Sequence, residues 1–444
     1  MTMPLMKPRR KNPVLRTPQM NLPPWARGRT ALGMTAAAAE GRFELQVCER
    51  CAAVQYPPRD ACHRCLSAQL AWRAQSGAGE LLSETVLHHS NDPFYRERLP
   101  WRLGLVRLDA GPTVIVHLHG DVASPISTQG TVAAAPAASG EPAPRQPPRP
   151  PQRSVRVHVG ARLDRAGAAV LIGFPPEESE HMADDKMLRE MASDPRFRKI
   201  LVTDGKTAVG QALVQALVKA GAEIVWVGHA EPWKKLPGLD DISALAPVTL
   251  VPLDLSNGRS VVELAGEIGG KVDIVVNNAE VHRAFGIAAR RGTDAARAEM
   301  DINYFGLLRL AQELGPALRA RSADGTTHAA AWVNLLSVYA LSNYPPHGTF
   351  SASKAAAHSL AQCLRAEMRP SGIRVINVFP GPIDDEWNQN LPPPKVAPAA
   401  LASAIVKALK EGIEDVYPGD VAQEWLERWR ENPKVLEREL SAGG

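Results

Sequence analysis

The pattern of apolar and polar residues changes near residue 197, and the change divides the chain into two parts. From residue 199 onward, short apolar runs alternate with longer stretches that carry apolar residues at helical spacing. We expect strands at residues 200–203, 223–227, 249–253, 272–276, 331–336 and 373–378. Helices are expected at residues 209–220, 261–268, 300–319, 351–368 and 401–409. Such alternation predicts an α/β doubly wound Rossmann domain over residues 197–444.

The preceding part has the pattern of an all-β domain. Short runs of β-branched and apolar residues, separated by turn residues, occupy positions 81–89, 102–108, 113–119, 155–159 and 168–174. Five strands form an OB barrel. A low-complexity stretch rich in Ala, Pro, Gln and Arg, about residues 123–153, follows the third run. Because two further strands follow it, we interpret it as an insertion within a domain covering residues 41–176.

The remaining segments are expected to lack a core of their own. Residues 1–40 are basic and rich in proline and show no hydrophobic period, so they predict a disordered tail. Residues 177–196 are acidic at first and are expected to form the interdomain linker. The chain therefore reads as a multi-domain protein, with the β-domain first and the α/β domain second.

Composition narrows the function classes. The formal net charge is only +4 and the charged fraction is 22%, which argues against wholesale nucleic-acid binding. No apolar run reaches the roughly 18 residues that a membrane helix needs. The N-terminus also lacks the apolar core of a secretory signal, so a cytoplasmic location is expected.

Four of the five cysteines form two Cys-x2-Cys pairs separated by ten residues: Cys48, Cys51, Cys62 and Cys65. Two such turns can bring four thiolates to one point, which is the tetrahedral arrangement that zinc prefers. Four protein ligands predict a closed structural site. A redox pair or loose thiols is the alternative, and His63 is a substitute ligand within the second turn. Cys363 stands alone and is expected to be a small buried residue.

The β-domain resembles the OB-fold acyl-CoA-associated proteins that carry a rubredoxin-like zinc ribbon. The resemblance covers residues 41–176 and depends on the cysteine ribbon, followed by Gly79-Glu80-Leu81-Leu82-Ser83, Val155-Arg156-Val157 and Phe174-Pro175-Pro176. It implies a domain without catalysis of its own, which partners a thiolase-like or aldolase-like subunit acting on acyl-CoA thioesters. The insertion at about 123–153 departs from that family.

The α/β domain carries an ordered set of motifs. Val202-Thr203-Asp204-Gly205-Lys206-Thr207-Ala208-Val209-Gly210 lies where a strand leads into a helix, the usual place for a pyrophosphate. Asp254-Leu255, Asn277-Asn278-Ala279, Asn303, Ser337, Lys354 and Pro380-Gly381 follow. This order resembles the short-chain dehydrogenase/reductase (SDR) family over residues 197–440. The resemblance implies an NADP or NAD site at Thr203, Gly205, Gly210, Asp254, Asn277, Lys354 and Gly381.

The resemblance also implies catalytic roles for Ser337, Lys354 and Asn303, but the family's tyrosine position holds Phe350. In the family, the serine polarises a carbonyl, the lysine lowers the tyrosine pKa and binds the nicotinamide ribose, and the asparagine orders a water relay. Phenylalanine has no proton to donate, and loss of a general acid costs roughly 100- to 10,000-fold in rate. Tyr339 and Tyr344 are the substitute donors on the neighbouring loop.

Further departures oppose cofactor binding. Asp204 and Ala208 replace glycines of the phosphate loop, and Glu280 stands where the family has glycine after Asn277-Asn278-Ala279. Asp384-Asp385 occupies the neighbourhood of a threonine that usually reaches the nicotinamide amide. Gly228-His229 carries no acidic residue, and Lys234 and Lys235 follow, which favours NADP over NAD if a dinucleotide binds.

Three functions remain open. The first is an accessory or assembly subunit with a degenerate dehydrogenase site. The second is an active NAD(P)-dependent oxidoreductase acting on a 3-oxoacyl or 3-hydroxyacyl thioester with a substitute proton donor. The third keeps Ser337 and Lys354 for non-redox chemistry on a thioester. The SDR resemblance also implies homo-oligomers formed through residues 300–319 and 351–368.

Overall fold

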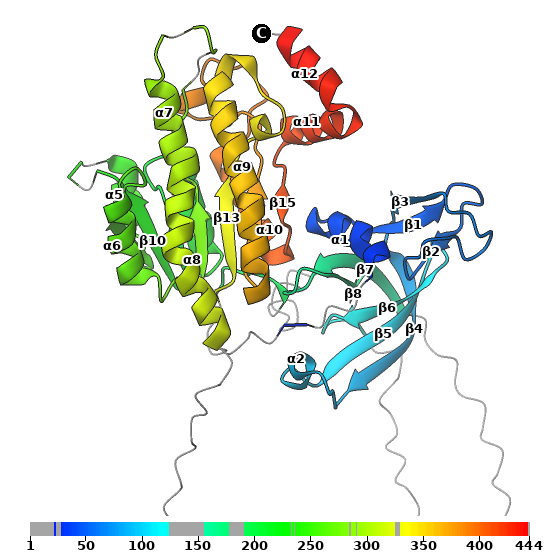
Figure 1. Cartoon of the computed structure of the whole chain (residues 1–444). Helices are drawn as coiled ribbons and strands as arrows, with labels where there is room; N and C mark the ends of the chain where they lie inside the picture. Colours follow the sequence, from blue (N-terminus) through cyan, green and yellow to red (C-terminus); the bar gives the residue numbers. More distant parts are fainter. Residues whose placement is uncertain are drawn as a thin grey trace, which may run out of the picture. The chain divides into compact units, whose positions relative to one another are not determined.

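The computed structural model describes residues 22–23, 28–123, 155–176 and 191–442, except 232, 235, 284–285, 290 and 325–328. These residues separate into two compact units, one within residues 23–192 and the other within 193–444 (Figure 1). The expected low-complexity insertion lies almost entirely outside the described residues, as does most of the expected linker.

The first unit begins with a small antiparallel sheet that carries the cysteines. Strand β1 (Glu44–Cys48) pairs with β2 (Val54–Gln55) on one side and with β3 (Leu70–Ala74) on the other. Two buried glutamines fix the loop below it, because Gln55 Nε2 donates to Gln46 Oε1 at 2.9 Å and Gln46 Oε1 accepts from Arg59 N at 2.8 Å. The sheet thereby holds both cysteine turns at its edge.

The barrel has the five strands that the sequence predicts. They are β4 (Ala78–Leu87), β5 (Trp101–Leu108), β6 (Thr113–Leu118), β7 (Val155–Leu163) and β8 (Ala169–Phe174). The barrel closes in the order β4-β5-β6-β8-β7, with β6 and β8 parallel and the other described pairs antiparallel. The strands before and after the low-complexity stretch therefore belong to one barrel. The short helix α2 (Pro93–Arg96) lies between β4 and β5, capped by Asp92.

The structure corrects the expected tail at its C-terminal end. Residues 29–31 form a 3-10 turn and α1 (Leu32–Ala39) follows it. Met34 and Ala38 are buried in the barrel core beside Leu45 and Val159. The sequence lacked a clear helical period here because half of the helix is alanine, and small side chains let it lie close to the strands.

The second unit is a seven-stranded parallel sheet in the order β11-β10-β9-β12-β13-β14-β15. Its strands are β9 (Lys199–Val202), β10 (Ile224–His229), β11 (Val248–Pro252), β12 (Ile274–Asn277), β13 (Ala331–Leu335), β14 (Arg374–Val378) and β15 (Asp415–Val416). All residues of β12, β13 and β14 are buried, as expected of strands covered on both faces. The predicted doubly wound fold is confirmed.

Helices cover both faces of this sheet, as Figure 1 shows. One core joins the sheet to α6 (Gly258–Ile268), α8 (Leu307–Asp324) and α9 (Gly348–Met368). The other joins it to α4 (Ala208–Lys219), α5 (Pro237–Ser243) and α10 (Pro398–Glu411). The polar strand ends that follow β9, β12 and β13 therefore gather at one edge of the sheet, where an α/β fold binds ligands.

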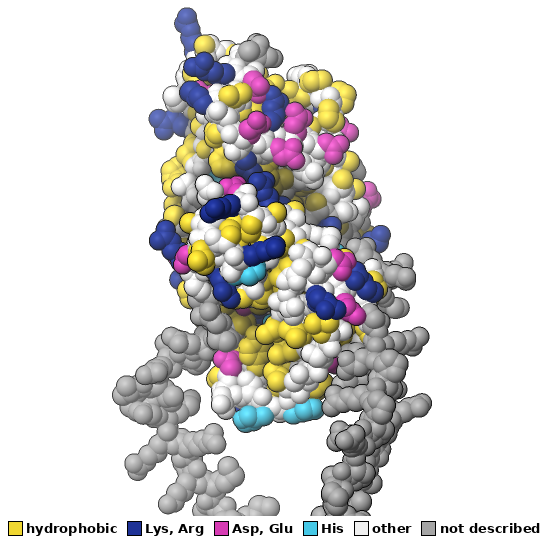
Figure 2. Space-filling model, turned by 90° about the vertical axis from the view of Figure 1, so that its right-hand side faces the viewer, with side chains coloured by type: hydrophobic (Ala, Val, Ile, Leu, Met, Phe, Trp, Pro, Cys, Tyr) yellow, Lys and Arg dark blue, Asp and Glu magenta, His cyan; other side chains and the backbone are white. Residues whose placement is uncertain are grey.

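Several elements were not expected from the pattern. They are α5, α7 (Asp294–Met300), β15, and the C-terminal helices α11 (Asp420–Glu431) and α12 (Pro433–Ala442). No helix within the described residues is long and apolar enough to cross a membrane. On the face drawn in Figure 2, Lys and Arg side chains are interspersed with acidic and apolar ones, consistent with the small net charge.

Candidate functional site

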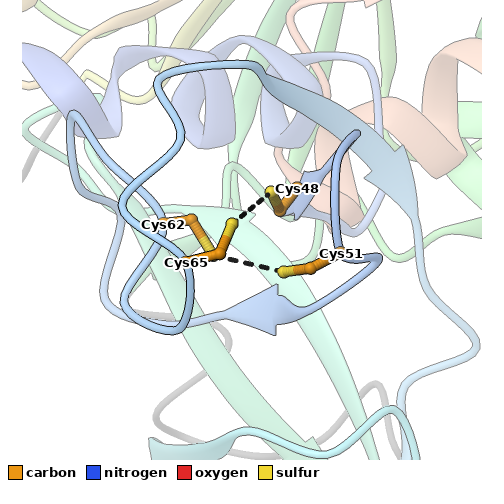
Figure 3. A group of neighbouring side chains, drawn as sticks. All are labelled: Cys48, Cys51, Cys62 and Cys65. Carbon is orange, nitrogen blue, oxygen red and sulfur yellow. Dashed lines mark hydrogen bonds between the residues drawn. The ribbon is translucent and has the colours of Figure 1, made fainter.

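The four cysteines of the ribbon point toward one another from two loops (Figure 3). Their Sγ atoms all lie within 4.8 Å of one another, with Cys48 3.5 Å from Cys65 and Cys51 3.6 Å from Cys62. Cys48 and Cys62 are buried. The predicted set of four is thus brought together, and His63 instead lies at 3.2 Å from Gln55 Oε1 through its Nδ1.

The two cysteine loops share one backbone geometry. In the first, Ala52 N donates to Cys48 O at 2.8 Å, and in the second, Leu66 N donates to Cys62 O at 3.0 Å. Ala52 and Leu66 both have positive φ, 56° and 60°, which is uncommon for residues with a side chain. Both turns adopt this unfavourable backbone conformation, and together they bring the four sulfur atoms into one cluster. The cluster therefore fits a structural zinc ion.

The second unit gathers a polar group where β9 and β12 end. Thr203 Oγ1 accepts from Asn278 N at 3.0 Å and from Ala279 N at 3.1 Å, and donates to Asn277 Oδ1 at 3.3 Å. Asn278 Nδ2 also donates to Asp204 O. Thr203 and Asn277, both predicted as cofactor residues, thus hold the two strand ends together.

Both retained glycines of the loop after β9 serve close packing. A Cβ on Gly210 would lie 2.0 Å from Asp204 O, and one on Gly205 would lie 2.2 Å from Val227 Cγ1. The helix that follows is capped by Thr207, whose Oγ1 accepts from Gly210 N at 3.1 Å. The loop therefore keeps the tight strand-to-helix turn of a dinucleotide fold.

Carboxylates surround the pocket beside this loop. The pocket has a volume of about 130 Å³, and its lining includes four carboxylates, Asp204, Glu231, Asp254 and Glu280, beside the basic side chains Lys206 and His229. Burial raises the pKa of Asp204, with Glu280 contributing to the rise, although Lys206 N donates to Asp204 Oδ1. Such a lining disfavours the anionic pyrophosphate of a dinucleotide.

The segment after β10 bears on the choice between NADP and NAD. Glu231 lines the pocket, whereas Lys234 is an exposed side chain that lies 3.6 Å from the Glu231 carboxylate. Lys235 lies outside the described residues. An acidic side chain here suits a free ribose hydroxyl better than a 2′-phosphate.

Asn303 and Ser337, the asparagine and serine predicted to be catalytic, both have hydrogen-bond partners within the protein. Asn303 lies in a π-helical segment, Asp301–Gly306, ahead of α8, a distortion often found at functional sites. Its Oδ1 accepts from Val281 N at 2.9 Å, and its Nδ2 donates to Ser353 Oγ at 2.8 Å. Ser337 is buried at the end of β13, and its Oγ accepts from Tyr339 N at 3.2 Å.

Lys354 is held in a buried ion pair that the sequence did not predict. Its Nζ lies 2.8 Å from Glu280 Oε2 and donates to Leu335 O at 2.9 Å. Only 2% of the Lys354 side chain and 11% of the Glu280 side chain are exposed. Among the described residues, the pocket lining ends at Glu280 and Val281 and includes neither Ser337, Phe350 nor Lys354.

Phe350 is enclosed by aromatic rings at the tyrosine position. It is buried, and its ring stacks on His282 with centroids 3.8 Å apart and 17° between the planes. His282 Nε2 lies 2.9 Å from His347 Nδ1. Lys354 Nζ is 5.4 Å from the Phe350 ring centroid. The place of a proton donor is therefore filled by a hydrocarbon ring with a histidine pair beside it.

The two loop tyrosines stack on each other. Tyr339 and Tyr344 have ring centroids 5.0 Å apart at 14°, and Tyr339 also contacts Trp425 of α11. Tyr339 is buried, and that burial raises the pKa of its phenol. A raised pKa makes Tyr339 a weaker proton donor than a catalytic tyrosine beside a lysine.

Gly381 and the acidic pair Asp384-Asp385 lie in the segment that follows β14. A Cβ on Gly381 would lie 2.9 Å from Val421 Cγ1, so this glycine permits close packing of the helix. Asp385 Oδ1 accepts from Trp387 N at 3.0 Å and from Asn388 Nδ2 at 2.9 Å. Burial, and then the charge of Glu280, raise the pKa of Asp385.

Sequence reasoning missed the functional contacts made by Glu280, His282 and His347. Glu280 was recognised only as a departure from glycine. Its pairing with Lys354 joins the end of β12 to α9, across 74 positions of the chain, and no local pattern reports such a contact. The signal available in the sequence was that Glu280 replaces the family's glycine in the same predicted site that retains Lys354.

Three family models match the chain in the order that the sequence suggested. The ChsH2 rubredoxin-like zinc ribbon domain matches residues 35–71, the ChsH2 C-terminal OB-fold domain matches 72–135, and the short chain dehydrogenase model matches 198–395. A short-chain dehydrogenase from Burkholderia cenocepacia, solved in complex with NADP, is 33% identical. The match covers 56% of this chain and 98% of that one, with a TM-score of 0.50. The α/β domain belongs to the short-chain dehydrogenase/reductase family.

The protein is thus a fusion of ChsH2-type zinc ribbon and OB domains with an SDR domain. An uncharacterized oxidoreductase of Staphylococcus aureus strain USA300 is 27% identical over 217 residues, which are 48% of this chain and 90% of that protein. An Anopheles gambiae protein named dehydrogenase/reductase SDR family protein 7-like is 28% identical over 50% of this chain and 75% of its own length. Both matches cover no more than about half of the fusion.

The SDR domain does not fit a dinucleotide at its nicotinamide end. Lys354, which the family uses for the nicotinamide ribose, already has the Glu280 carboxylate as its partner. The loop after β9 keeps the backbone geometry of a cofactor site. The lysine that would bind the nicotinamide ribose, Lys354, is instead paired with Glu280.

Acidification is expected to destabilise the SDR domain through His282. Burial lowers the pKa of His282 from 6.5 to about 4. The unfolded chain therefore binds this proton first as the pH falls, so stability is full above pH 6.5 and declines toward pH 4. The loss from this group reaches about 3 kcal/mol. Hydrogen exchange of peptides from α9, measured between pH 7 and pH 4, should show the decline.

The matched variant is His282→Phe, which keeps a ring against Phe350 and removes the titrating group. We expect a shallower decline in this variant, though His347, whose pKa burial also lowers, retains part of the slope. An unchanged slope in His282→Phe would show that other groups carry the acid sensitivity.

Proposed function

We propose that this chain is a catalytically impaired SDR-family protein that serves as an accessory or assembly subunit of a thiolase-like or aldolase-like enzyme in acyl-CoA metabolism. The observation that carries the proposal is Phe350, buried against His282 in the position of the family's proton donor. A hydride transfer to a carbonyl needs a proton for the oxygen, and the ring of Phe350 supplies none.

The contacts of the neighbouring polar groups support this proposal. Tyr339 is buried with a raised pKa and stacks on Tyr344. Lys354 donates to a carbonyl and a carboxylate rather than lying free beside a phenol. Asn303 and Ser337 keep hydrogen bonds within the protein, which are consistent with roles in the fold.

The N-terminal domains support the accessory role. The ribbon places four sulfurs within 4.8 Å of one another and the barrel is closed, so this half retains a complete ChsH2-type fold. We propose that it contacts a thiolase-like or aldolase-like subunit and its acyl-CoA thioester. In the same proposal, α8 and α9 of the SDR domain mediate homo-oligomers, and the protein acts in the cytoplasm.

Two assays of the full chain test the proposal. The first follows NADPH and NADH oxidation with 3-oxoacyl-CoA substrates, and we expect no turnover above background. The second mixes the protein with candidate thiolase-like and aldolase-like subunits and measures complex formation by size-exclusion chromatography with light scattering. A stable complex is expected, and Phe350→Tyr should leave it unchanged because Phe350 is buried in the SDR domain.

Each assay has an outcome against the proposal. Steady turnover by the wild-type protein would favour an active oxidoreductase with a substitute donor, to be traced through Tyr339→Phe and Tyr344→Phe. Failure to bind any thiolase-like or aldolase-like subunit would remove the accessory role.

A further inference from the structure

Glu280 of the SDR domain lies between the pocket and Lys354. It follows Asn277-Asn278-Ala279 at the end of β12, and it belongs to the lining of the pocket beside the loop after β9. Its carboxylate turns toward α9 and reaches Lys354 at 2.8 Å. Glu280 is therefore both the end wall of the pocket and the partner of the lysine behind it.

The Glu280–Lys354 ion pair is buried, and the lysine has two partners within the protein. Lys354 Nζ has Glu280 on one side and the Leu335 carbonyl at 2.9 Å on the other, with 2% of the side chain exposed. A buried cation needs a partner of this kind, because desolvation of an unpaired ammonium costs several kcal/mol. The lysine is thus stable in this position without any ligand.

The charge of Glu280 also acts on its surroundings. It contributes to the raised pKa of Asp204 on the phosphate loop and of Asp385 in the segment after β14. Asp204 and Glu280 both line the pocket beside the phosphate loop, together with Glu231 and Asp254. Like charges in a partly buried site repel an anionic ligand.

We propose that Glu280 is a built-in occupant of the dinucleotide site, which takes the Lys354 cation in place of a ribose and excludes NADP and NAD. The inference deepens the proposed function, since it names the residue that closes the site. A dinucleotide could reach Lys354 only by displacing this carboxylate. The displaced charge would then lie beside Asp204, Asp385 and the incoming phosphates.

Removal of this one side chain should reopen the site, because the rest of the frame remains. Thr203 still joins the ends of β9 and β12, Thr207 still caps α4, and Gly210 still allows the tight turn. Glycine is the residue that the family has at position 280. Glu280 has no positive φ in the structure, so the substitution needs no change of backbone.

The test is isothermal titration of the full chain with NADPH and with NADH. We expect no saturable binding by the wild-type protein up to about 1 mM. Glu280→Gly should bind one of the two cofactors at least about tenfold more tightly than the wild type. Glu280→Gln, which removes the charge but keeps the volume, should show a smaller gain.

The matched control is Glu223→Gly, the same substitution in an exposed glutamate that lies 3.5 Å from Lys199 before β10. It should bind no better than the wild type. Micromolar binding by the wild type would overturn the inference. So would a folded Glu280→Gly without improved binding. Should Glu280→Gly fail to fold, Glu280→Gln decides, and an affinity equal to that of the wild type overturns the inference.

These outcomes are separate from those that test the proposed function. Cofactor binding by the wild type without turnover would remove the role of Glu280 and leave the impaired accessory protein standing. Improved binding by Glu280→Gly in a protein that contacts no thiolase-like or aldolase-like subunit would support the inference and contradict the accessory role.

Discussion

Replacement of Cys62 by alanine is expected to remove bound zinc and to unfold the ribbon around β1, β2 and β3. Cys62 is fully buried, and its Sγ lies 3.6 Å from that of Cys51. The ribbon sheet has only three short strands, so a metal must supply much of its stability. Zinc binding provides roughly 10–16 kcal/mol in zinc-finger peptides at neutral pH.

The measurement pairs metal content with local protection. Mass spectrometry of the purified protein should give one zinc per chain for the wild type and a large loss for Cys62→Ala. Hydrogen exchange should become fast in residues 44–74 and remain slow in β13 and α9 of the SDR domain. A chelator added to the wild type should reproduce the same local pattern.

Cys363→Ala is the matched control. The sequence suggested that Cys363 is buried, but it is exposed on α9 and lies outside the four-cysteine cluster. This variant should keep its zinc and its protection. Retention of zinc by Cys62→Ala would contradict a four-thiolate site and would favour His63 as a substitute ligand.

Local spacing was enough to predict the metal cluster and the frame of the fold. Cys-x2-Cys turns place their own sulfurs, so only the meeting of Cys48 and Cys51 with Cys62 and Cys65 had to be inferred. The parallel strands were equally readable, because β12, β13 and β14 are buried on both faces and ten of their fourteen residues are apolar. The order of motifs at their ends then placed Ser337, Asn303 and Lys354 in one region.

What the sequence could not supply are contacts between distant side chains and weakly patterned helices. Met34 anchors α1 in the barrel core, yet the helix ends in four alanines, which give no amphipathic period. The stacking of His282 on Phe350 depends on the path of the chain after β12. The effect of Glu280 depends on which way its side chain turns, toward the pocket or toward Lys354. A departure from the family's motif, such as Glu280, shows that a residue is unusual, but it does not show which side chain that residue contacts.

Replacement of Lys354 by methionine is expected to destabilise the SDR domain by about 3–5 kcal/mol. The variant leaves the Glu280 carboxylate, 11% exposed, without its cation. Methionine fills most of the space of the lysine stem, so the loss reports the unpaired charge rather than a cavity. Urea-dependent hydrogen exchange, followed in peptides from β13 and α9 of the full chain, measures the change.

A double-mutant cycle separates the stability contributed by the Lys354–Glu280 ion pair from the contributions of the two side chains individually. If the ion pair is the cause, Glu280→Leu in the Lys354→Met background should restore most of the lost stability, because two apolar side chains can replace a buried pair at little cost. Lys434→Met is the surface control, since Lys434 pairs with Glu437 on α12 with both side chains more than half exposed. Its effect should stay below about 1 kcal/mol. Equal losses in Lys354→Met and in the double variant would mean that Lys354 stabilises the domain through the Leu335 carbonyl, and that Glu280 is held in the site by other contacts.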